Sequence, residues 1–213
     1  MNLRDHYNIF YSESLSKFTL KNITKKDKAI FLDRDGILIE DVNHIRSPDQ
    51  VKLCKKLQEF LKFAKDHKYH IVVVTNQSSV SRGIISYPEY IKITEKFLSL
   101  LPINLYPENI LTSFHLPQNK SGLDNYSWRK PGIGMFEYAL KKYNLNPKKS
   151  IMVGDKLSDL IPAENCRFSK LIYIKSILHS KELEKVKEWN TKKMKKIEVF
   201  YELDFLKMIL NNN

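Results

Sequence analysis

The chain has 213 residues, of which 42% are hydrophobic and 28% are charged, a composition typical of a globular protein and not of a disordered one. It contains no apolar run long enough to cross a bilayer, and Asp5, His6 and Glu13 lie where a secretory signal would need an apolar core. Cys54 and Cys166 are far apart and form no Cys-x-x-Cys spacing, which argues against a disulfide. We therefore expect a cytoplasmic protein with one main domain and no membrane partner.

The formal net charge is +12, and a charge of this size raises the question of a nucleic-acid partner. The lysines concentrate in two stretches, residues 21–28 and 181–196. Their spacing in the second stretch is typical of a solvated helix. Aromatic residues, which serve as stacking platforms in single-strand binders, are not interleaved there beyond Trp189. A dedicated nucleic-acid surface is therefore not expected.

Two regions are predicted, an extension at residues 1–27 and a domain at residues 28–213. The extension contains several large apolar side chains, so it is expected to pack on the domain or on a partner chain. In the domain, short β-branched runs alternate with amphipathic segments. The runs predict strands at 29–32, 70–75, 110–114, 150–153, 171–174 and 196–203. The amphipathic segments predict helices at 53–67, 88–101, 135–143, 157–165, 178–189 and 204–210. This alternation predicts a three-layer α/β fold, a mostly parallel sheet with helices on both faces and no large cap domain.

The first predicted strand leads directly into Asp33, Arg34, Asp35 and Gly36. Open α/β sheets bind ligands at the carboxyl ends of their strands, and Gly36 frees the backbone for a tight turn at this point. Two carboxylates so close repel each other unless a cation, a shared proton or a cationic substrate neutralises them. By itself this stretch fits either a polar turn or a Mg²⁺ site.

Other polar residues accompany the neighbouring predicted strands. Thr75 and Asn76 end the second strand, and Asp155 follows the fourth. Lys130 lies after a long loop and directly before the third helix. Since the ends of parallel strands meet at one edge of a sheet, we expect these side chains to converge with Asp33.

Three carboxylates, a hydroxyl and a lysine in one place match the needs of phosphoryl transfer. In this hypothesis Asp33 attacks phosphorus to form an aspartyl-phosphate, and Asp35 donates a proton to the leaving oxygen and later accepts one from water. Asp155 completes a Mg²⁺ site with Asp33 and the carbonyl of Asp35. Thr75 and Lys130 bind the phosphoryl oxygens.

Four stretches resemble the motifs of the haloacid dehalogenase superfamily of phosphatases. They are Phe-Leu-Asp-Arg-Asp-Gly at 31–36, Val-Val-Thr-Asn-Gln-Ser at 73–78, Arg-Lys-Pro-Gly at 129–132 and Val-Gly-Asp-Lys-Leu-Ser-Asp at 153–159. The residues in and around these motifs are most similar to those of the branch that contains D-glycero-D-manno-heptose 1,7-bisphosphate phosphatase and histidinol phosphatase. The resemblance covers about residues 29–165. It implies that Asn76, Arg82, Arg129 and Lys156 bind phosphate or sugar hydroxyls, while Asp159 orients Lys156 or caps its helix.

That branch usually carries a structural zinc ion in the long loop before the Arg-Lys-Pro motif, held by a Cys-x-His pair and a Cys-x-Cys pair. The corresponding positions here are Ser113, His115, Tyr126 and Trp128. One imidazole cannot hold a closed tetrahedral zinc ion, so no structural zinc is expected in this loop. Tyr126 and Trp128 are expected to hold the loop by packing instead.

The leading hypothesis is a Mg²⁺-dependent phosphatase of a small phosphorylated sugar, a heptose bisphosphate or a related precursor of a surface polysaccharide such as lipopolysaccharide. Such an enzyme would be a monomer or a homodimer. Histidinol-phosphate phosphatase is one alternative, and a nucleic-acid 3′-end phosphatase is another because the chain is basic. A non-catalytic binding protein of the same fold is a further alternative, against which the presence of Asp33, Asp35, Lys130 and Asp155 argues.

Overall fold

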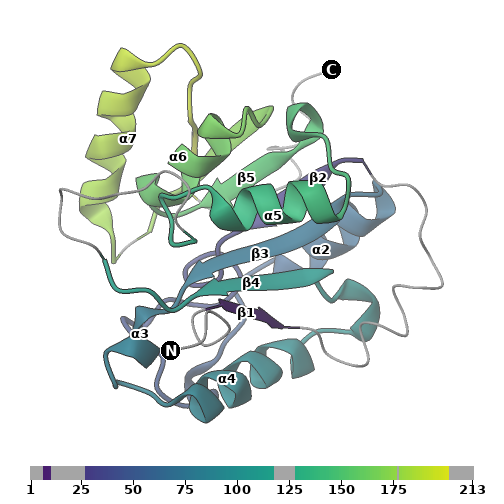
Figure 1. Ribbon diagram of the computed structural model, residues 1–213, viewed down its shortest axis with the longest axis vertical. Helices are drawn as coiled ribbons and strands as arrows, with labels where there is room; N and C mark the ends of the chain where they lie inside the picture. The colour runs from purple at the N-terminus through teal and green to yellow at the C-terminus, as the bar shows by residue number, and fades with distance from the viewer. Residues whose placement is uncertain (1–6, 11–26, 118–127, 177, 202–213) are drawn as a thin grey trace.

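The computed structural model of the protein describes residues 7–10, 27–117, 128–176 and 178–201. Within these residues the centre is a seven-stranded sheet in the order β1-β4-β3-β2-β5-β6-β7 (Figure 1). The strands are β1 (Tyr7–Phe10), β2 (Ala29–Leu32), β3 (His70–Asn76), β4 (Asn109–Ser113), β5 (Ile151–Gly154), β6 (Lys170–Ile174) and β7 (Glu198–Phe200). Strands β2 to β7 are parallel, whereas β1 pairs with β4 in the antiparallel sense at one edge.

Helices cover both faces of this sheet (Figure 1). One face carries α2 (Leu57–Asp66) and α4 (Tyr87–Ser99), and the other carries α5 (Gly134–Lys142), α6 (Leu157–Asn165) and α7 (Ser180–Lys192). The shorter helical elements are α3 (Ser78–Ser81), η2 (Pro48–Gln50), η3 (Ile103–Leu105) and η4 (Pro147–Lys149). Between β2 and α2, where every residue is described, the chain forms loops and η2 and no inserted domain. The predicted three-layer, mostly parallel α/β fold is confirmed.

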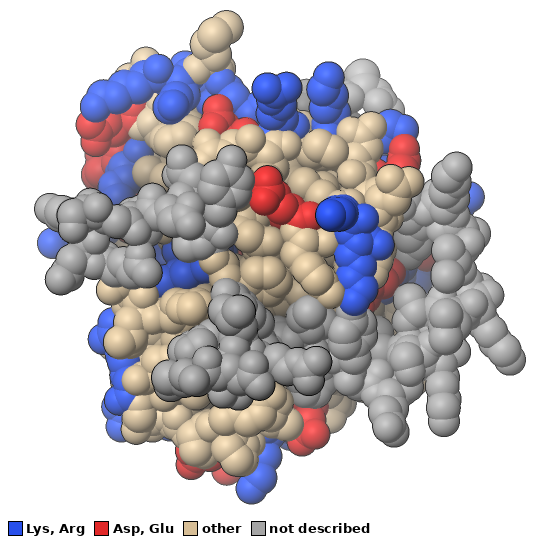
Figure 2. Space-filling model, in the orientation of Figure 1, with Lys and Arg blue, Asp and Glu red and all other residues tan. Residues whose placement is uncertain are grey.

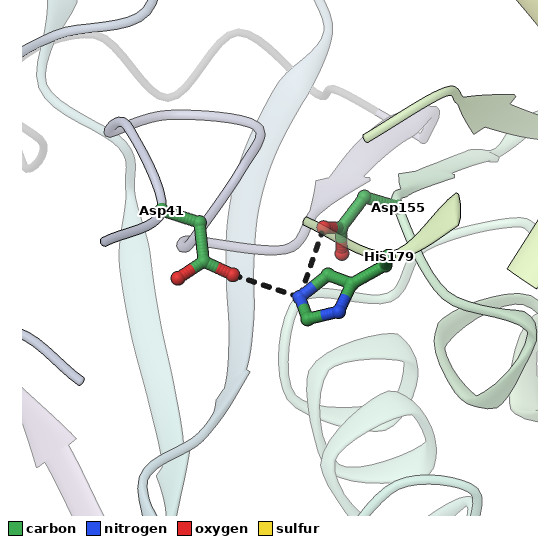
Figure 3. A group of neighbouring side chains, drawn as sticks. All are labelled: Asp41, Asp155 and His179. Carbon is green, nitrogen blue, oxygen red and sulfur yellow. Dashed lines mark hydrogen bonds and ion pairs between the residues drawn. The ribbon is translucent and has the colours of Figure 1, made fainter. Parts of the chain in front are cut away.

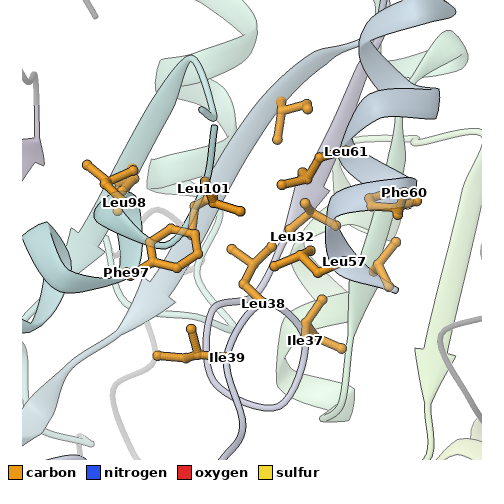
Figure 4. Close-up of a cluster of buried hydrophobic side chains, with 14 of the residues drawn as sticks. Leu32, Ile37, Leu38, Ile39, Leu57, Phe60, Leu61, Phe97, Leu98 and Leu101 are labelled. Atoms are coloured by element: carbon orange, nitrogen blue, oxygen red, sulfur yellow. The ribbon is translucent and has the colours of Figure 1, made fainter. Parts of the chain in front are cut away.

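Successive residues of β2 enter different cores, because the side chains of a strand point alternately to its two faces. Ile30 and Leu32 join the apolar cluster beneath α2 and α4, part of which is drawn in Figure 4. Ala29 and Phe31 join the cluster beneath α5 and α6, where the ring of Phe31 stacks on that of Phe136 with centroids 5.4 Å apart. All four residues of β2 are fully buried. The strand is therefore a rigid base for the residues that follow it.

The lysine-rich helix α7 carries ion pairs along its own surface. They are Lys185 with Glu182 at 2.5 Å, Lys187 with Glu184 at 2.8 Å and Lys192 with Glu188 at 2.6 Å. Figure 2 shows blue and red side chains next to one another over this helix, at the upper left of the view. Pairs three or four residues apart lie on one face of a helix and support it. These lysines thus face glutamates of their own helix.

The structure differs from the predicted elements in several places. The strand β1 was not predicted, because Tyr7–Phe10 contains the polar Asn8 and is not a continuous apolar run like 29–32. The helix predicted at 53–67 begins only at Leu57, since Lys56 has a left-handed backbone with φ of 60°. The predicted strand at 196–203 is confirmed over Glu198–Phe200.

Some predicted elements lie outside the described residues. These are the helix at 204–210, the last two residues of the strand at 196–203 and most of the extension at 1–27. In the part of the chain that the structure describes, none of the helices combines the length and the apolar character needed to span a membrane.

Candidate active site

The carboxyl ends of β2, β3 and β5 meet at one edge of the sheet, because these strands are adjacent and parallel. Asp33 directly follows β2, Thr75 and Asn76 end β3, and Asp155 follows β5. Asp33, Thr75 and Asn76 line a pocket of about 280 Å³ together with Lys130, close to the lower limit of about 300 Å³ for typical small-molecule sites. The predicted convergence of strand ends therefore occurs.

Lys130 is the buried counter-charge of Asp33. Its Nζ lies 2.7 Å from Oδ1 of Asp33, 2.8 Å from Oδ1 of Asp159 and 2.7 Å from the carbonyl oxygen of Val74. Burial alone would lower the pKa of Lys130, but the charges of Asp159 and Asp33 outweigh it and raise the pKa above its ordinary value. Lys130 is therefore a fixed cation that holds Asp33 in place. Its contact with phosphoryl oxygens stays a prediction.

Asp159 serves two partners. Its Oδ2 accepts a hydrogen bond from the backbone N–H of Lys156 at 3.0 Å, which confirms the predicted cap of α6. Its Oδ1 pairs with Lys130, and sequence reasoning missed this role. The sequence did contain a signal for this role, because Asp159 follows Asp155 by four residues. Residues four apart across the first turn of a helix lie on one side of it, so both carboxylates can lie at the end of the strand.

Asp35 is held from two sides. The guanidinium of Arg34 donates to Oδ1 of Asp35 from Nε at 3.1 Å and from Nη2 at 3.0 Å. The side-chain amide of Gln77 donates to Oδ2 of Asp35 at 2.6 Å and to Oγ1 of Thr75 at 2.9 Å. Gln77 thus connects two predicted site residues, a role that was not predicted. Its place directly after Thr75 and Asn76 was the available signal.

Asp155 is fully buried, and neither of its carboxylate oxygens has a hydrogen-bond partner among the described residues. Burial and the charges of Asp159 and Asp33 raise the pKa of Asp155 to about 8. A buried carboxylate without donors is destabilising unless a positive charge offsets it. Oxygen atoms of Asp33, Asp155 and Asp159 lie within 4.8 Å of one another. This group therefore fits a divalent cation that prefers oxygen ligands.

Lys156 and Arg129 line the same pocket. Nζ of Lys156 lies 3.9 Å from Oδ1 of Asp155, so its charge reaches the acidic group. Arg129 donates from Nη1 to the carbonyl oxygen of His115 at 2.7 Å, and burial together with the charge of Arg82 lowers its pKa. Both cations thus line the pocket, and their contact with a phosphorylated ligand stays a prediction.

Asn76 and Arg82, both predicted to bind substrate, lie in different places relative to the pocket, and substrate binding by either stays a prediction. The side chain of Asn76 exchanges two hydrogen bonds with the backbone of Lys130, at 3.0 and 3.1 Å, and so fixes that segment beside the end of β3. Arg82 is exposed at the end of α3 and is not among the described residues that line the pocket. The structure brings Asn76 into the site and leaves Arg82 outside it.

The long loop returns to the domain at Trp128. Its indole Nε1 donates to the carbonyl oxygen of Thr112 at 2.9 Å, and its ring meets the edge of Tyr138 with centroids 5.7 Å apart. The predicted packing role of Trp128 is confirmed. Tyr126, for which the same role was predicted, lies outside the described residues.

His179 joins the site from the residue before α7. Its Nε2 lies 2.8 Å from Oδ2 of Asp41 and 3.8 Å from Oδ2 of Asp155 (Figure 3). His179 and Asp41 both line the pocket that contains Asp33. Sequence reasoning missed both residues, because His179 lies in a lysine-rich helical segment and Asp41 in an irregular stretch without a recognisable pattern.

A model of the family described as polynucleotide kinase 3 phosphatase matches residues 28–201. The D-glycero-alpha-D-manno-heptose-1,7-bisphosphate 7-phosphatase of Photorhabdus laumondii is 34% identical over 157 residues, which are 71% of this chain and 84% of that protein. The D-glycero-beta-D-manno-heptose-1,7-bisphosphate 7-phosphatase of Haemophilus ducreyi is 34% identical over 153 residues, 70% of this chain and 84% of that protein.

Solved structures show the same fold. The D,D-heptose 1,7-bisphosphate phosphatase of B. bronchiseptica, complexed with magnesium and phosphate, superimposes with a TM-score of 0.69 at 22% identity and covers 87% of this chain and 99% of its own. The four motifs, the strand-end site and the matched family agree. The chain belongs to the polynucleotide kinase 3 phosphatase family and is a phosphatase of the haloacid dehalogenase type.

Proposed function

We propose that this protein is a cytoplasmic, Mg²⁺-dependent phosphatase that hydrolyses a small phosphorylated sugar, D-glycero-D-manno-heptose 1,7-bisphosphate or a related heptose phosphate. The observation that carries the proposal is the buried Asp33–Lys130 pair beside the unpartnered carboxylate of Asp155, an oxygen of which lies within 4.8 Å of one of Asp33. The names of the relatives in Photorhabdus laumondii and Haemophilus ducreyi support the substrate class. Because these two relatives act on opposite anomers and are equally identical to this chain, the proposal covers both anomers.

The residues present fit a divalent cation, because Asp155 is buried without a hydrogen-bond donor. A Mg²⁺ ion held by Asp33, Asp155 and the carbonyl of Asp35 would screen the charge of Asp33 from an anionic phosphate. Lys130 holds the carboxylate of Asp33 at the strand end through the 2.7 Å contact of its Nζ. Gln77 and Arg34 fix the carboxylate of Asp35.

In the proposed reaction, a carboxylate oxygen of Asp33 attacks phosphorus. The bond from phosphorus to the sugar oxygen breaks, and that oxygen takes a proton from Asp35. Water then attacks the phosphorus of the aspartyl-phosphate and gives a proton to Asp35. The bond from phosphorus to Asp33 breaks, which releases inorganic phosphate and restores both carboxyl groups.

A nucleic-acid 3′-end phosphatase is the second candidate, favoured by the description of the matched family and by the net charge of +12. The ion pairs of α7 argue against a nucleic-acid substrate, because Lys185, Lys187 and Lys192 are paired with glutamates of their own helix. Binding of a phosphate backbone releases counterions and needs lysines that are free to contact it. The sugar phosphate is therefore the better-supported substrate.

The deciding experiment measures kcat/KM for both anomers of the heptose bisphosphate, for histidinol phosphate and for a 3′-phosphorylated oligonucleotide, each over a salt series. We expect a preference for a heptose bisphosphate and a shallow dependence on salt. A preference for the oligonucleotide, with affinity that falls by orders of magnitude from low to moderate salt, would establish the second candidate instead. A preference for histidinol phosphate would overturn the sugar assignment.

A further inference from the structure

We propose that Asp41, Asp155 and His179 form a second divalent-cation site, next to the group of Asp33, Asp155 and Asp159. Its mixed nitrogen and oxygen ligands suit a transition metal such as Zn²⁺ or Co²⁺, whereas Mg²⁺ prefers oxygen ligands and bound water. The proposal does not depend on which phosphate ester the enzyme hydrolyses.

The three side chains come from parts of the chain that are distant in sequence. Asp41 lies in the loop after β2, Asp155 follows β5 and His179 precedes α7 (Figure 3). Nε2 of His179 is 2.8 Å from Oδ2 of Asp41 and 3.8 Å from Oδ2 of Asp155, and the ligand atoms of the group lie within 4.8 Å of one another. Atoms that share one zinc ion lie about 3–4 Å apart, because each is about 2.0–2.2 Å from it. The 3.8 Å separation of His179 and Asp155 falls in this range, whereas the 2.8 Å contact of His179 and Asp41 is a hydrogen bond that a bound ion would replace.

Asp155 supplies independent support. It is fully buried, and both of its oxygens lack a hydrogen-bond partner among the described residues. It is also the one residue that belongs to both groups. A carboxylate with two unpartnered oxygens can bridge two cations, which lie about 3.5–4 Å apart in known two-metal sites. The oxygen Oδ2 is the one that faces His179.

The site is open to an ion from solution. His179 and Asp41 line the pocket and retain 27% and 12% of their side-chain exposure, whereas Asp155 has none. An ion could therefore enter from the pocket and reach the buried carboxylate. The alternative to a cation site is a purely structural role for His179. In that case His179 pairs with Asp41 and connects the start of α7 to the loop after β2.

The test uses the full chain saturated with Mg²⁺ and titrated with Co²⁺, followed by calorimetry and visible absorption. We expect one Co²⁺ to bind per chain in the presence of Mg²⁺. His179→Gln and Asp41→Asn should each weaken Co²⁺ binding at least about tenfold. His44→Gln is the matched control, because His44 lines the same pocket but is not part of the group. It should leave Co²⁺ binding unchanged.

The proposal requires that Co²⁺ binds to the Mg²⁺-saturated wild type and that the His179→Gln variant binds it more weakly. If Co²⁺ fails to bind to the Mg²⁺-saturated protein, or binds the His179→Gln variant as tightly as the wild type, the site does not exist. Thermal unfolding shows whether each variant is folded. NMR spectroscopy of the wild-type protein tests the site without a variant. Bound Co²⁺ must shift and broaden the imidazole signals of His179. Phosphate release with Mg²⁺ alone tests the proposed function separately.

Discussion

Nζ of Lys130 lies 2.7 Å from Oδ1 of Asp33, and the two residues are only 3% and 5% exposed. A pair so short and so deeply buried loses little to solvent screening. Lys130 reaches it from the far side of a long loop, 97 residues along the chain. The pair therefore links the segment that follows this loop to the position of the proposed nucleophile.

Lys130→Met should destabilise the protein strongly and abolish turnover. Removing the ammonium leaves Asp33 and Asp159 buried without a counter-charge, and breaking a buried pair typically costs about 3–5 kcal/mol. Denaturant unfolding measures the loss. The control is Lys149→Met, which removes an exposed pair with Asp27 and should have little effect. Equal stability of the two variants would show that the buried pair does not hold the site together.

Asp33→Asn should remove activity without unfolding the protein. The amide keeps the shape of the side chain but is not a nucleophile, and Lys130 keeps its contact with Asp159. We expect kcat to fall by at least about 10⁴-fold. The control is Asp49→Asn, at an exposed position outside the pocket. Near-normal turnover of a pure Asp33→Asn preparation would contradict the covalent mechanism.

Gly36→Ala and Gly83→Ala form a matched pair. Both glycines have positive φ, 86° and 68°, so alanine should destabilise both by about 1–2 kcal/mol. A Cβ at Gly36 would lie 2.6 Å from Oδ2 of Asp155, whereas a Cβ at Gly83 meets nothing within 4 Å. Only Gly36→Ala should therefore displace Asp155 and lower kcat and Mg²⁺ affinity. Equal activity of the two variants would disprove this close approach.

Gln77→Leu should lower kcat while the fold is retained. The substitution removes the 2.6 Å hydrogen bond to Asp35 and the 2.9 Å hydrogen bond to Thr75. A hydrogen bond to a charged group contributes about 1.5–3 kcal/mol, which corresponds to a loss of about 10- to 100-fold. The control is Gln58→Leu, at an exposed position on α2. Unchanged kinetics of Gln77→Leu would mean that Arg34 alone holds Asp35.

Removal of divalent cations should stop turnover, and Mg²⁺ should restore it. Ca²⁺ should restore it poorly, because it takes six to eight oxygen ligands at longer distances than the octahedral Mg²⁺ and would misplace Asp33 for attack. Phosphate release after chelation and re-addition of each ion measures the difference. Equal rates with the two ions would contradict the proposed Mg²⁺ site.

Much of the fold was predictable, because the signals are local. Buried parallel strands such as 29–32 and 70–75 are continuous apolar runs, and the helix at 157–165 was predicted with the bounds that the structure has. Residues directly after such strands, Asp33 and Asp155 above all, must lie at one edge of a parallel sheet. Their convergence follows from sequence order and strand direction alone.

The sequence by itself determined the fold class, the four motifs and the strand-end carboxylates. Only the tertiary structure decided which oxygen of Asp159 pairs with Lys130, that Arg82 stays outside the pocket, and that His179 meets Asp41, 138 residues away. Periodicity reports which face of an element is buried, but not which distant side chain lies opposite. That choice depends on how the helices pack on the sheet, and it brings the start of α7 to the carboxylate of Asp155.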